Sequence, residues 1–140
     1  MSNGVVQTAA PSRQLGRSIL ALLAGFAVAV VLSLLADVIL HAIHYYPPMG
    51  QPPTSPELVV STLYRTLFGI LSAWVTARLA PYKPLGHALL GGAIGAILAL
   101  GGAIATWKMN LGAHWYPIAL VVLALPTAWI GGKLRVVQLR

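Results

Sequence analysis

Four long apolar segments dominate the sequence, at residues 18–43, 58–80, 85–107 and 116–134. Each is close to the length of about 20 residues that an α-helix needs to cross the hydrocarbon core of a bilayer. Lipid offers no hydrogen bonds to an open backbone, so a crossing segment is either a helix or a strand of a closed barrel. The alternation of apolar and polar residues that a barrel needs is absent. The sequence therefore predicts an all-α integral membrane protein folded as a four-helix bundle.

The composition supports the membrane class. Only 8% of the 140 residues are charged and 58% are hydrophobic, whereas soluble domains carry about a quarter charged residues. The net charge of +7 does not indicate nucleic acid as a partner, because the basic residues lie in small groups at segment ends without interleaved aromatics. There is no cysteine, which excludes disulfides, thiol catalysis and cysteine-ligated metals. We expect the lipid bilayer as the surrounding partner, and no cofactor.

The basic residues also predict how the chain is oriented, since cytoplasmic loops of membrane proteins are enriched in Lys and Arg. With helices that alternate in direction, one side carries Arg13, Arg17, Arg78, Lys83, Lys133, Arg135 and Arg140, and the other carries Lys108. We therefore expect a multi-pass protein of the cell inner membrane, with cytoplasmic tails at 1–17 and 136–140 around a transmembrane domain at 18–135. The proline-rich segment after Tyr45 and Tyr46 would face outward, with these tyrosines in an interfacial aromatic belt.

The two halves of the chain resemble each other. Residues 23–35 align with residues 89–101 at one fixed offset, and residues 72–80 align with 127–135, where both segments contain an Ala-Trp pair. Two spans per half would give duplicated helical hairpins that enter the membrane in parallel orientation. Apolar segments also resemble one another by chance, so duplication and coincidence both stay open.

Small residues recur every four positions in the first and third segments, and so lie on one face of each helix. The first stripe contains Gly25 and Ala29, and the stripe of the third segment contains Gly91, Gly95 and Ala99. Small side chains let helix backbones approach closely in lipid. We predict that these residues are helix-packing positions within one chain. Contact with a second copy in a homodimer, or within a larger membrane complex, is the alternative.

The first stripe continues outward to Asp37 and His41, so a charged group lies on a packing face. At about 1.5 Å per residue, Asp37 lies roughly 10 Å below the outer end of its helix, and Arg65 roughly 12 Å below the outer end of the next one. A lone charge in lipid is costly, so we predict an intramembrane ion pair between Asp37 and Arg65. We expect Ser61 or Tyr64 to help satisfy the guanidinium donors. Both a static clamp and a functional site stay open as roles for the pair.

Further polar residues toward the outer end form a candidate polar site, made up of His41, His44, Glu57, Ser61, Tyr64 and His114. The spacing Asp-x3-His-x2-His, with Glu57 and His114 nearby, offers oxygen and nitrogen ligands of the kind that zinc takes. No established motif such as His-Glu-x-x-His is present, and we assign no metal ligand. The alternatives are polar residues at the level of the headgroups and a proton relay with Asp37, because histidine titrates near neutral pH.

The stretch YRTLFGILSAWVTARLAPYKPLGHALLGG, residues 64–92, resembles a broad group of small, uncharacterised bacterial four-helix inner-membrane proteins. Those proteins share an outer proline-rich loop after a Tyr or His cluster, and a turn from Ala-Arg-Leu-Ala into proline and His-Ala. The resemblance extends over residues 19–135 and implies the fold and a bacterial inner membrane, but no activity. The chain is also superficially similar to the small multidrug resistance transporters, which are four-helix dimers with a carboxylate in the first helix. Here the carboxylate lies nearer the outer surface and is paired with Arg65, which departs from their pattern.

These features favour a non-enzymatic integral membrane protein that serves as an accessory or small scaffold subunit. No phosphate-binding loop, nucleophile elbow or pair of carboxylates points to an enzyme, and we identify no catalytic residue. The rival hypothesis is a small dimeric transporter or proton-coupled permease that uses Asp37 and Arg65. A weaker alternative is a membrane protein that binds a metal on its outer face.

Overall fold

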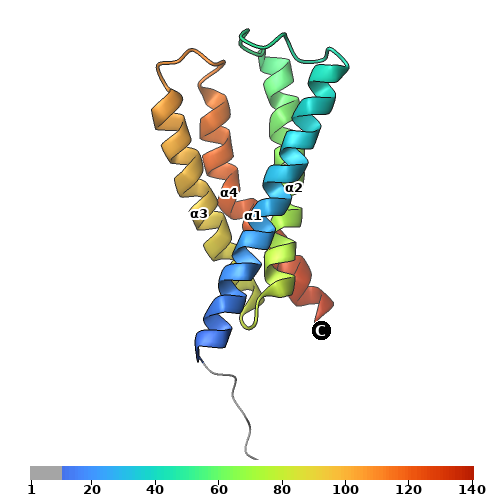
Figure 1. The fold of residues 1–140 in the computed structure, drawn as a ribbon, viewed down its shortest axis with the longest axis vertical. Helices are drawn as coiled ribbons and strands as arrows, with labels where there is room; N and C mark the ends of the chain where they lie inside the picture. The colour runs from blue at the N-terminus through green and yellow to red at the C-terminus, as the bar shows by residue number, and fades with distance from the viewer. Residues whose placement is uncertain (1–10) are drawn as a thin grey trace, which may run out of the picture.

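The computed structural model describes residues 11–140 and contains four α-helices there (Figure 1). They are α1 (Pro11–Ala42), α2 (Ser55–Leu79), α3 (Pro84–Thr106) and α4 (Trp115–Gln138). Each helix is long and apolar enough to cross a membrane. The predicted fold class is confirmed in this respect, as an all-helical protein with four helices of spanning length.

The helices match the predicted spans closely except toward the two ends of the chain. α1 begins at Pro11 rather than Ser18, so residues 11–17 of the predicted tail are helical; residues 1–10 of that tail lie outside the described residues. α4 continues past Leu134 to Gln138. Both extensions carry arginine and glutamine, and a long basic side chain can reach water from the end of a spanning helix. Hydropathy marks only the apolar part of a helix, so it misses such extensions.

The start of α2 shows how the sequence sets a helix end near the outer loops. Thr54 is the N-cap, and its backbone N–H donates to Glu57 Oε2 at 2.6 Å. The spacing Thr-x-x-Glu is that of a capping box, with Pro56 in the first turn, where a missing N–H costs nothing. Glu57 is thereby held at the terminus of its own helix.

The helices form two hairpins, α1–α2 and α3–α4, that cross near one end and separate toward the other (Figure 1). We call the end with the connecting segments 43–54 and 107–114 the outer end, and the end with the turn 80–83 the inner end. α2 packs closely against all three other helices, whereas α1 and α4 have no pair of Cα atoms within 8 Å in residues 11–140. The contact between the hairpins is therefore made mainly by α2 and α4.

Small residues make the closest contacts in the inner half. A Cβ added at Gly131 of α4 would collide with the Ile70 carbonyl oxygen of α2 and would lie 2.7 Å from the Cβ of Ala73. In the first hairpin, an added Cβ at Gly25 would collide with Thr76, and the Ser72 hydroxyl donates to the Gly25 carbonyl at 2.6 Å. Such close approach of backbones is the packing that small residues permit in lipid.

Gly95 and Ala99 of the small stripe of α3 line cavities rather than a close helix contact, which differs from the prediction, whereas Gly91 contacts α1. A Cβ at Gly95 would meet no heavy atom within 4 Å, and one at Gly91 would touch only the tip of one α1 side chain, at 3.4 Å. α3 packs on α4 through Gly92, where an added Cβ would collide with Ala128. Neighbouring residues differ in direction by about 100° around a helix, and the spacing of small residues does not say which direction faces a neighbour.

A polar contact joins α1 to α3 at the inner end. His87 Nε2 and Ser18 Oγ are 2.9 Å apart, and both side chains are buried. His87 also packs edge to face against Tyr82 of the inner turn, with ring centroids 5.0 Å apart. This contact closes the space between α1 and α3 at the inner end.

Candidate functional site

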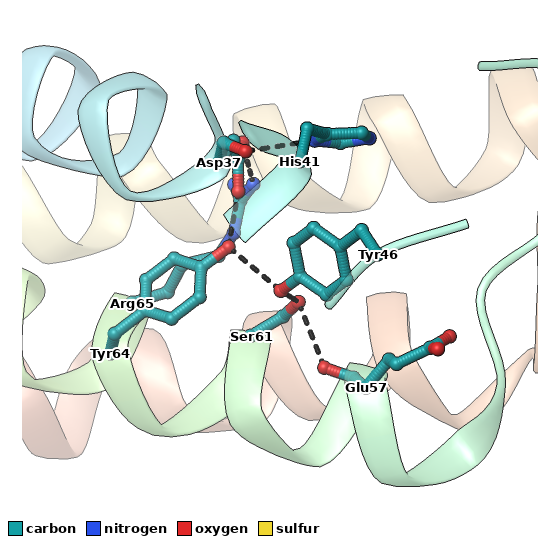
Figure 2. A network of polar contacts seen from close by, with 7 residues as sticks. All are labelled: Asp37, His41, Tyr46, Glu57, Ser61, Tyr64 and Arg65. Carbon is teal, nitrogen blue, oxygen red and sulfur yellow. Dashed lines mark hydrogen bonds and ion pairs between the residues drawn. The ribbon is translucent and has the colours of Figure 1, made fainter. Parts of the chain in front are cut away.

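An ion pair joins the outer halves of α1 and α2 (Figure 2). Arg65 Nη2 donates to Asp37 Oδ2 at 2.8 Å. The Asp37 and Arg65 side chains are 27% and 33% exposed, so each is partly covered by protein. The structure therefore contains the pair that the matching depths of the two charges predict, and each charge neutralises the other at low dielectric.

Tyr64 holds the second oxygen of the carboxylate. Its hydroxyl donates to Asp37 Oδ1, while Arg65 takes Oδ2, so both carboxylate oxygens accept hydrogen bonds from α2 (Figure 2). We predicted that Ser61 or Tyr64 would lie close enough to help satisfy the guanidinium; Tyr64 does lie beside it, with its ring centroid 5.8 Å from Arg65 Cζ. Tyr64 satisfies the acid, and Arg65 Nε is buried without a hydrogen-bond partner within residues 11–140. A phenol can donate to a carboxylate, whereas a guanidinium has only donors to offer.

Tyr46 also belongs to this hydrogen-bond network, although we expected it in an interfacial aromatic belt. Its hydroxyl is hydrogen-bonded to the Ser61 hydroxyl and lies 3.1 Å from the Tyr64 hydroxyl, and the residue is 9% exposed. The Ser61 hydroxyl also donates to the Glu57 carbonyl at 3.2 Å. The reason lies in the backbone: the chain turns at His44 with a φ of 59°. A left-handed residue other than glycine is uncommon, and no sequence signal here indicated that this turn returns Tyr46 to the bundle.

We expect Tyr46→Phe to lower the free energy of unfolding by about 1–2 kcal/mol, because the hydroxyls of Ser61 and Tyr64 lose a buried partner. Thermal unfolding of the purified protein in one detergent measures the change. Tyr45→Phe is the matched control, since Tyr45 is the adjacent tyrosine and is 40% exposed. Equal unfolding temperatures for the two variants would contradict a role for the Tyr46 hydroxyl.

The structure brings one of the candidate histidines to this network. His41 Nδ1 donates to the Asp37 backbone carbonyl at 2.8 Å, and its ring meets Tyr46 with centroids 5.2 Å apart. His44 lies exposed in the turn after α1. His114 is on the other outer loop, 3.0 Å from the Trp107 carbonyl and against the Trp107 ring.

The candidate metal ligands are not assembled. Glu57 serves the start of its own helix, and His44 and His114 lie apart from the Asp37 network. Among residues 11–140, no group of three or more His, Cys, Asp or Glu side chains is placed to hold a metal ion. The described residues therefore provide no cluster of ligands for a metal site on the outer face.

The ion pair stands at the wall of a cavity between the two hairpins. This outer cavity has a volume of about 540 Å³ and is lined by all four helices and both outer loops. Its polar lining includes Asp37, His41, Tyr46, Ser61, Arg65, Thr106, His114 and Tyr116, among mostly apolar residues. Tyr116 of α4 was not among the candidates, because its position in the first turn of an apolar helix resembles that of any interfacial tyrosine.

A second cavity continues toward the inner end. This inner cavity also measures about 540 Å³, and apart from Arg65 its lining is apolar or small, including Ala29, Gly91 and Gly95. Arg65 and Leu120 line both cavities, so the two meet at the level of the ion pair. Volumes of this size are typical of sites for small molecules. The arrangement is a polar chamber above an apolar one, with a charged pair at their junction.

No protein-family model matches the chain, and comparisons with curated proteins and with solved structures give no match either. The fold and the site are therefore the whole basis for assigning a function.

Proposed function

We propose that the chain is a multi-pass protein of a bacterial inner membrane, with all four helices crossing it and both termini in the cytoplasm. The observation that supports this most is where the side chains lie. The buried residues are mostly Ala, Ser, Thr and Gly, while Leu20, Ile97 and Val122 are 64%, 68% and 65% exposed. Extensive exposed apolar surface is a liability in water, but it is the surface that a bundle presents to lipid.

The orientation gives a direct test. Epitope tags at either terminus should be protected from external protease in right-side-out spheroplasts, because the basic residues gather at the inner end. A tag inserted at Gly50, in the exposed outer loop, should be cleaved. Lysed spheroplasts provide the control for protease activity on the terminal tags. Cleavage of the terminal tags with protection of the loop tag would reverse the proposed orientation.

Within this membrane we propose a non-enzymatic role: the outer cavity holds a bound molecule, and the protein serves as an accessory or small scaffold subunit. The supporting observation is that Asp37 and Arg65 share the cavity wall while remaining bound to each other. Both Asp37 oxygens accept hydrogen bonds within the protein. A carboxylate held by two donors is fixed in position, which suits recognition of a bound molecule.

A small proton-coupled permease is the second candidate, and one observation favours it. Asp37 lines the cavity and is linked through Tyr64 to Tyr46, which forms a chain of hydroxyls leading toward the outer loop. An acidic group on a membrane-embedded polar path is a common element of proton relays. In this alternative Asp37 would exchange protons with the cavity, and Arg65 would hold the carboxylate in place.

Reconstitution into proteoliposomes separates the two roles. In the accessory role, a pH-sensitive dye inside the vesicles reports no proton flux beyond that of protein-free vesicles when a pH gradient is imposed. In the permease role, wild type gives flux that Asp37→Asn abolishes. Glu57→Gln is the matched control, since Glu57 is the other acidic residue and its carboxylate serves the α2 cap. Flux in wild type that survives Asp37→Asn would contradict both assignments of Asp37.

A further inference from the structure

The two cavities together form one elongated space with a polar end and an apolar end. Along α1 the lining extends from His41 and Asp37 in the outer cavity to Ile19 in the inner cavity. From Asp37 to Ile19 this is about 27 Å of helix, most of the thickness of a hydrocarbon core. The space is therefore long and narrow, unlike the compact site of a polar metabolite.

The space opens sideways, between α1 and α3. α2 and α4 pack together behind it, whereas α1 and α3 approach each other at the inner end, through Ser18, His87 and the contact of Leu22 with Gly91. Farther out, both helices line the cavities from opposite sides. In a membrane this opening faces lipid, so a molecule dissolved in the bilayer can enter without crossing water.

Contacts within the chain lie at both ends of the space, and they favour one kind of occupant. Segments of both outer loops line the outer cavity, and Gly112 of one loop lies against Pro53 of the other, 3.7 Å from an added Cβ. The Ser18–His87 contact lies at the inner end. A spanning helix of a second copy or a partner has to pass both membrane surfaces, and these contacts stand in its way. A small molecule can fit between them.

The residues where the two cavities meet determine which polar group the bound molecule needs. Tyr64 and Arg65 each take one Asp37 oxygen, so the groups still open to a ligand there are mainly donors. The guanidinium of Arg65 has several N–H groups, of which the described residues take one at Asp37, and Tyr116 adds a hydroxyl on the cavity wall. The charges of the pair cancel, so the ligand needs an oxygen acceptor but no full charge.

The depth of the junction limits the size of the head. Asp37 lies about 8 Å below the end of α1, by helix rise, which is beneath the level of phospholipid headgroups. A bulky zwitterionic head would have to leave water to reach it. A carbonyl or carboxyl head can do so at lower cost, because it loses fewer hydrogen bonds.

We propose that this space binds a membrane-dissolved amphiphile with a small carbonyl or carboxyl head at Arg65 and Tyr116 and an apolar chain along α3 in the inner cavity. The inference rests on the binding role proposed for the outer cavity, and it names the ligand class. The molecule enters laterally between α1 and α3. Gly95 leaves room for its chain, which explains why this small residue lines an open space rather than a helix contact.

Photo-crosslinking tests the inference in phosphatidylcholine nanodiscs. The probe is a long-chain fatty acid with a diazirine on its chain, and labelled peptides are identified by mass spectrometry. We expect saturable labelling of α1 and α3 that unlabelled oleate displaces and oleylamine does not, because an ammonium head cannot accept hydrogen bonds. Gly95→Phe should abolish labelling by filling the chain site. Gly101→Phe is the matched control: it lies on the same helix, also has no heavy atom within 4 Å of an added Cβ, and lines neither cavity.

A separate variant tests the contact between Tyr116 and the polar head of the ligand. Tyr116→Phe removes one donor and keeps the ring, so probe affinity should fall roughly two- to tenfold, the effect of one hydrogen bond. Tyr45→Phe, outside both cavities, should leave it unchanged. Equal affinity of wild type and Tyr116→Phe would overturn the placement of the head.

Each of the other possible outcomes of the crosslinking experiment would overturn the proposed amphiphile. Equal labelling by a diazirine phosphatidylcholine, with no displacement by oleate, would identify bulk lipid and overturn the proposal. Crosslinked dimers that Gly95→Phe disrupts would identify a second copy as the occupant and overturn it as well. Absence of saturable labelling, with an engineered thiol at Ala99 still reactive in the same nanodiscs, would overturn the amphiphile but leave the binding role of the cavity. Absence of both would overturn both.

Discussion

Gly131→Ala is expected to prevent recovery of folded protein, the largest effect of any single methyl group in the chain. The added Cβ would collide with the Ile70 carbonyl of α2 and lie 2.7 Å from Ala73 Cβ and 2.9 Å from the Trp74 backbone nitrogen. Backbone atoms cannot turn aside as a flexible side chain can, so α2 and α4 must separate. Overpacking of a core costs about 1–3 kcal/mol and sometimes more, and here it falls on the main contact between the hairpins. Yield of monodisperse protein and thermal unfolding in detergent measure the effect.

Gly95→Ala is the matched control for that prediction. It is also a glycine inside an apolar helix, but its added Cβ meets no heavy atom within 4 Å. Alanine is favoured over glycine in a helix interior by about 1 kcal/mol, so Gly95→Ala should fold at least as well as wild type. If Gly131→Ala and Gly95→Ala unfolded at the same temperature, the close contact of α2 with α4 would be wrong.

Breaking the Asp37–Arg65 pair should give the second large effect. Removal of one member leaves the other without its partner, which in a buried pair costs about 3–5 kcal/mol. Both side chains are about one quarter to one third exposed, so we expect a smaller loss of roughly 2–4 kcal/mol for Asp37→Asn or Arg65→Gln. Arg65→Gln should be the worse variant, because Asp37 would keep only the Tyr64 hydroxyl as a partner.

The double variant tests whether the two residues act as one unit. Asp37→Asn combined with Arg65→Gln leaves no lone charge, so it should be more stable than the sum of the single losses predicts, by roughly 1–3 kcal/mol. Unfolding of all four proteins in the same detergent completes the cycle. Purely additive losses would show that the two charges contribute separately, despite the 2.8 Å between Arg65 Nη2 and Asp37 Oδ2.

The number of helices, the helical fold class and the Asp37–Arg65 ion pair could be predicted from sequence. Each depends only on residue type and on position along the chain. A run of apolar residues sets a span, and helix rise converts position into depth, which places Asp37 and Arg65 at one level. Which neighbouring helix a stripe of small residues contacts depends on how its own helix is rotated about its axis. Residue type and position along the chain do not give that rotation. Gly95 therefore was assigned to a contact that Gly92 and Gly131 make instead.

The rest of the site depends on loops. Tyr46 joins Ser61 and Tyr64 only because the backbone at His44 is left-handed, and the outer cavity exists because the hairpins separate above the contacts of the inner half. Hydropathy treats tyrosines near a span end alike, so Tyr45, Tyr46 and Tyr116 could not be told apart. The polar side chains on the faces of α1 and α2 were identified, as was His114, whereas Tyr46 and Tyr116 were missed.

The central claim is that cavities lie between the hairpins of a membrane-embedded bundle, beside a closely packed core of small residues in the inner half. Thiol reactivity tests it most directly, because the chain has no cysteine and each engineered one is the sole reporter. Ala99 of α3 lines the outer cavity, whereas Ala77 of α2 is 2% exposed in the inner core. In proteoliposomes, Ala99→Cys should react with N-ethylmaleimide in the folded protein, and Ala77→Cys should react only after denaturation. Protection of both thiols, or equal reaction of both, would contradict the account.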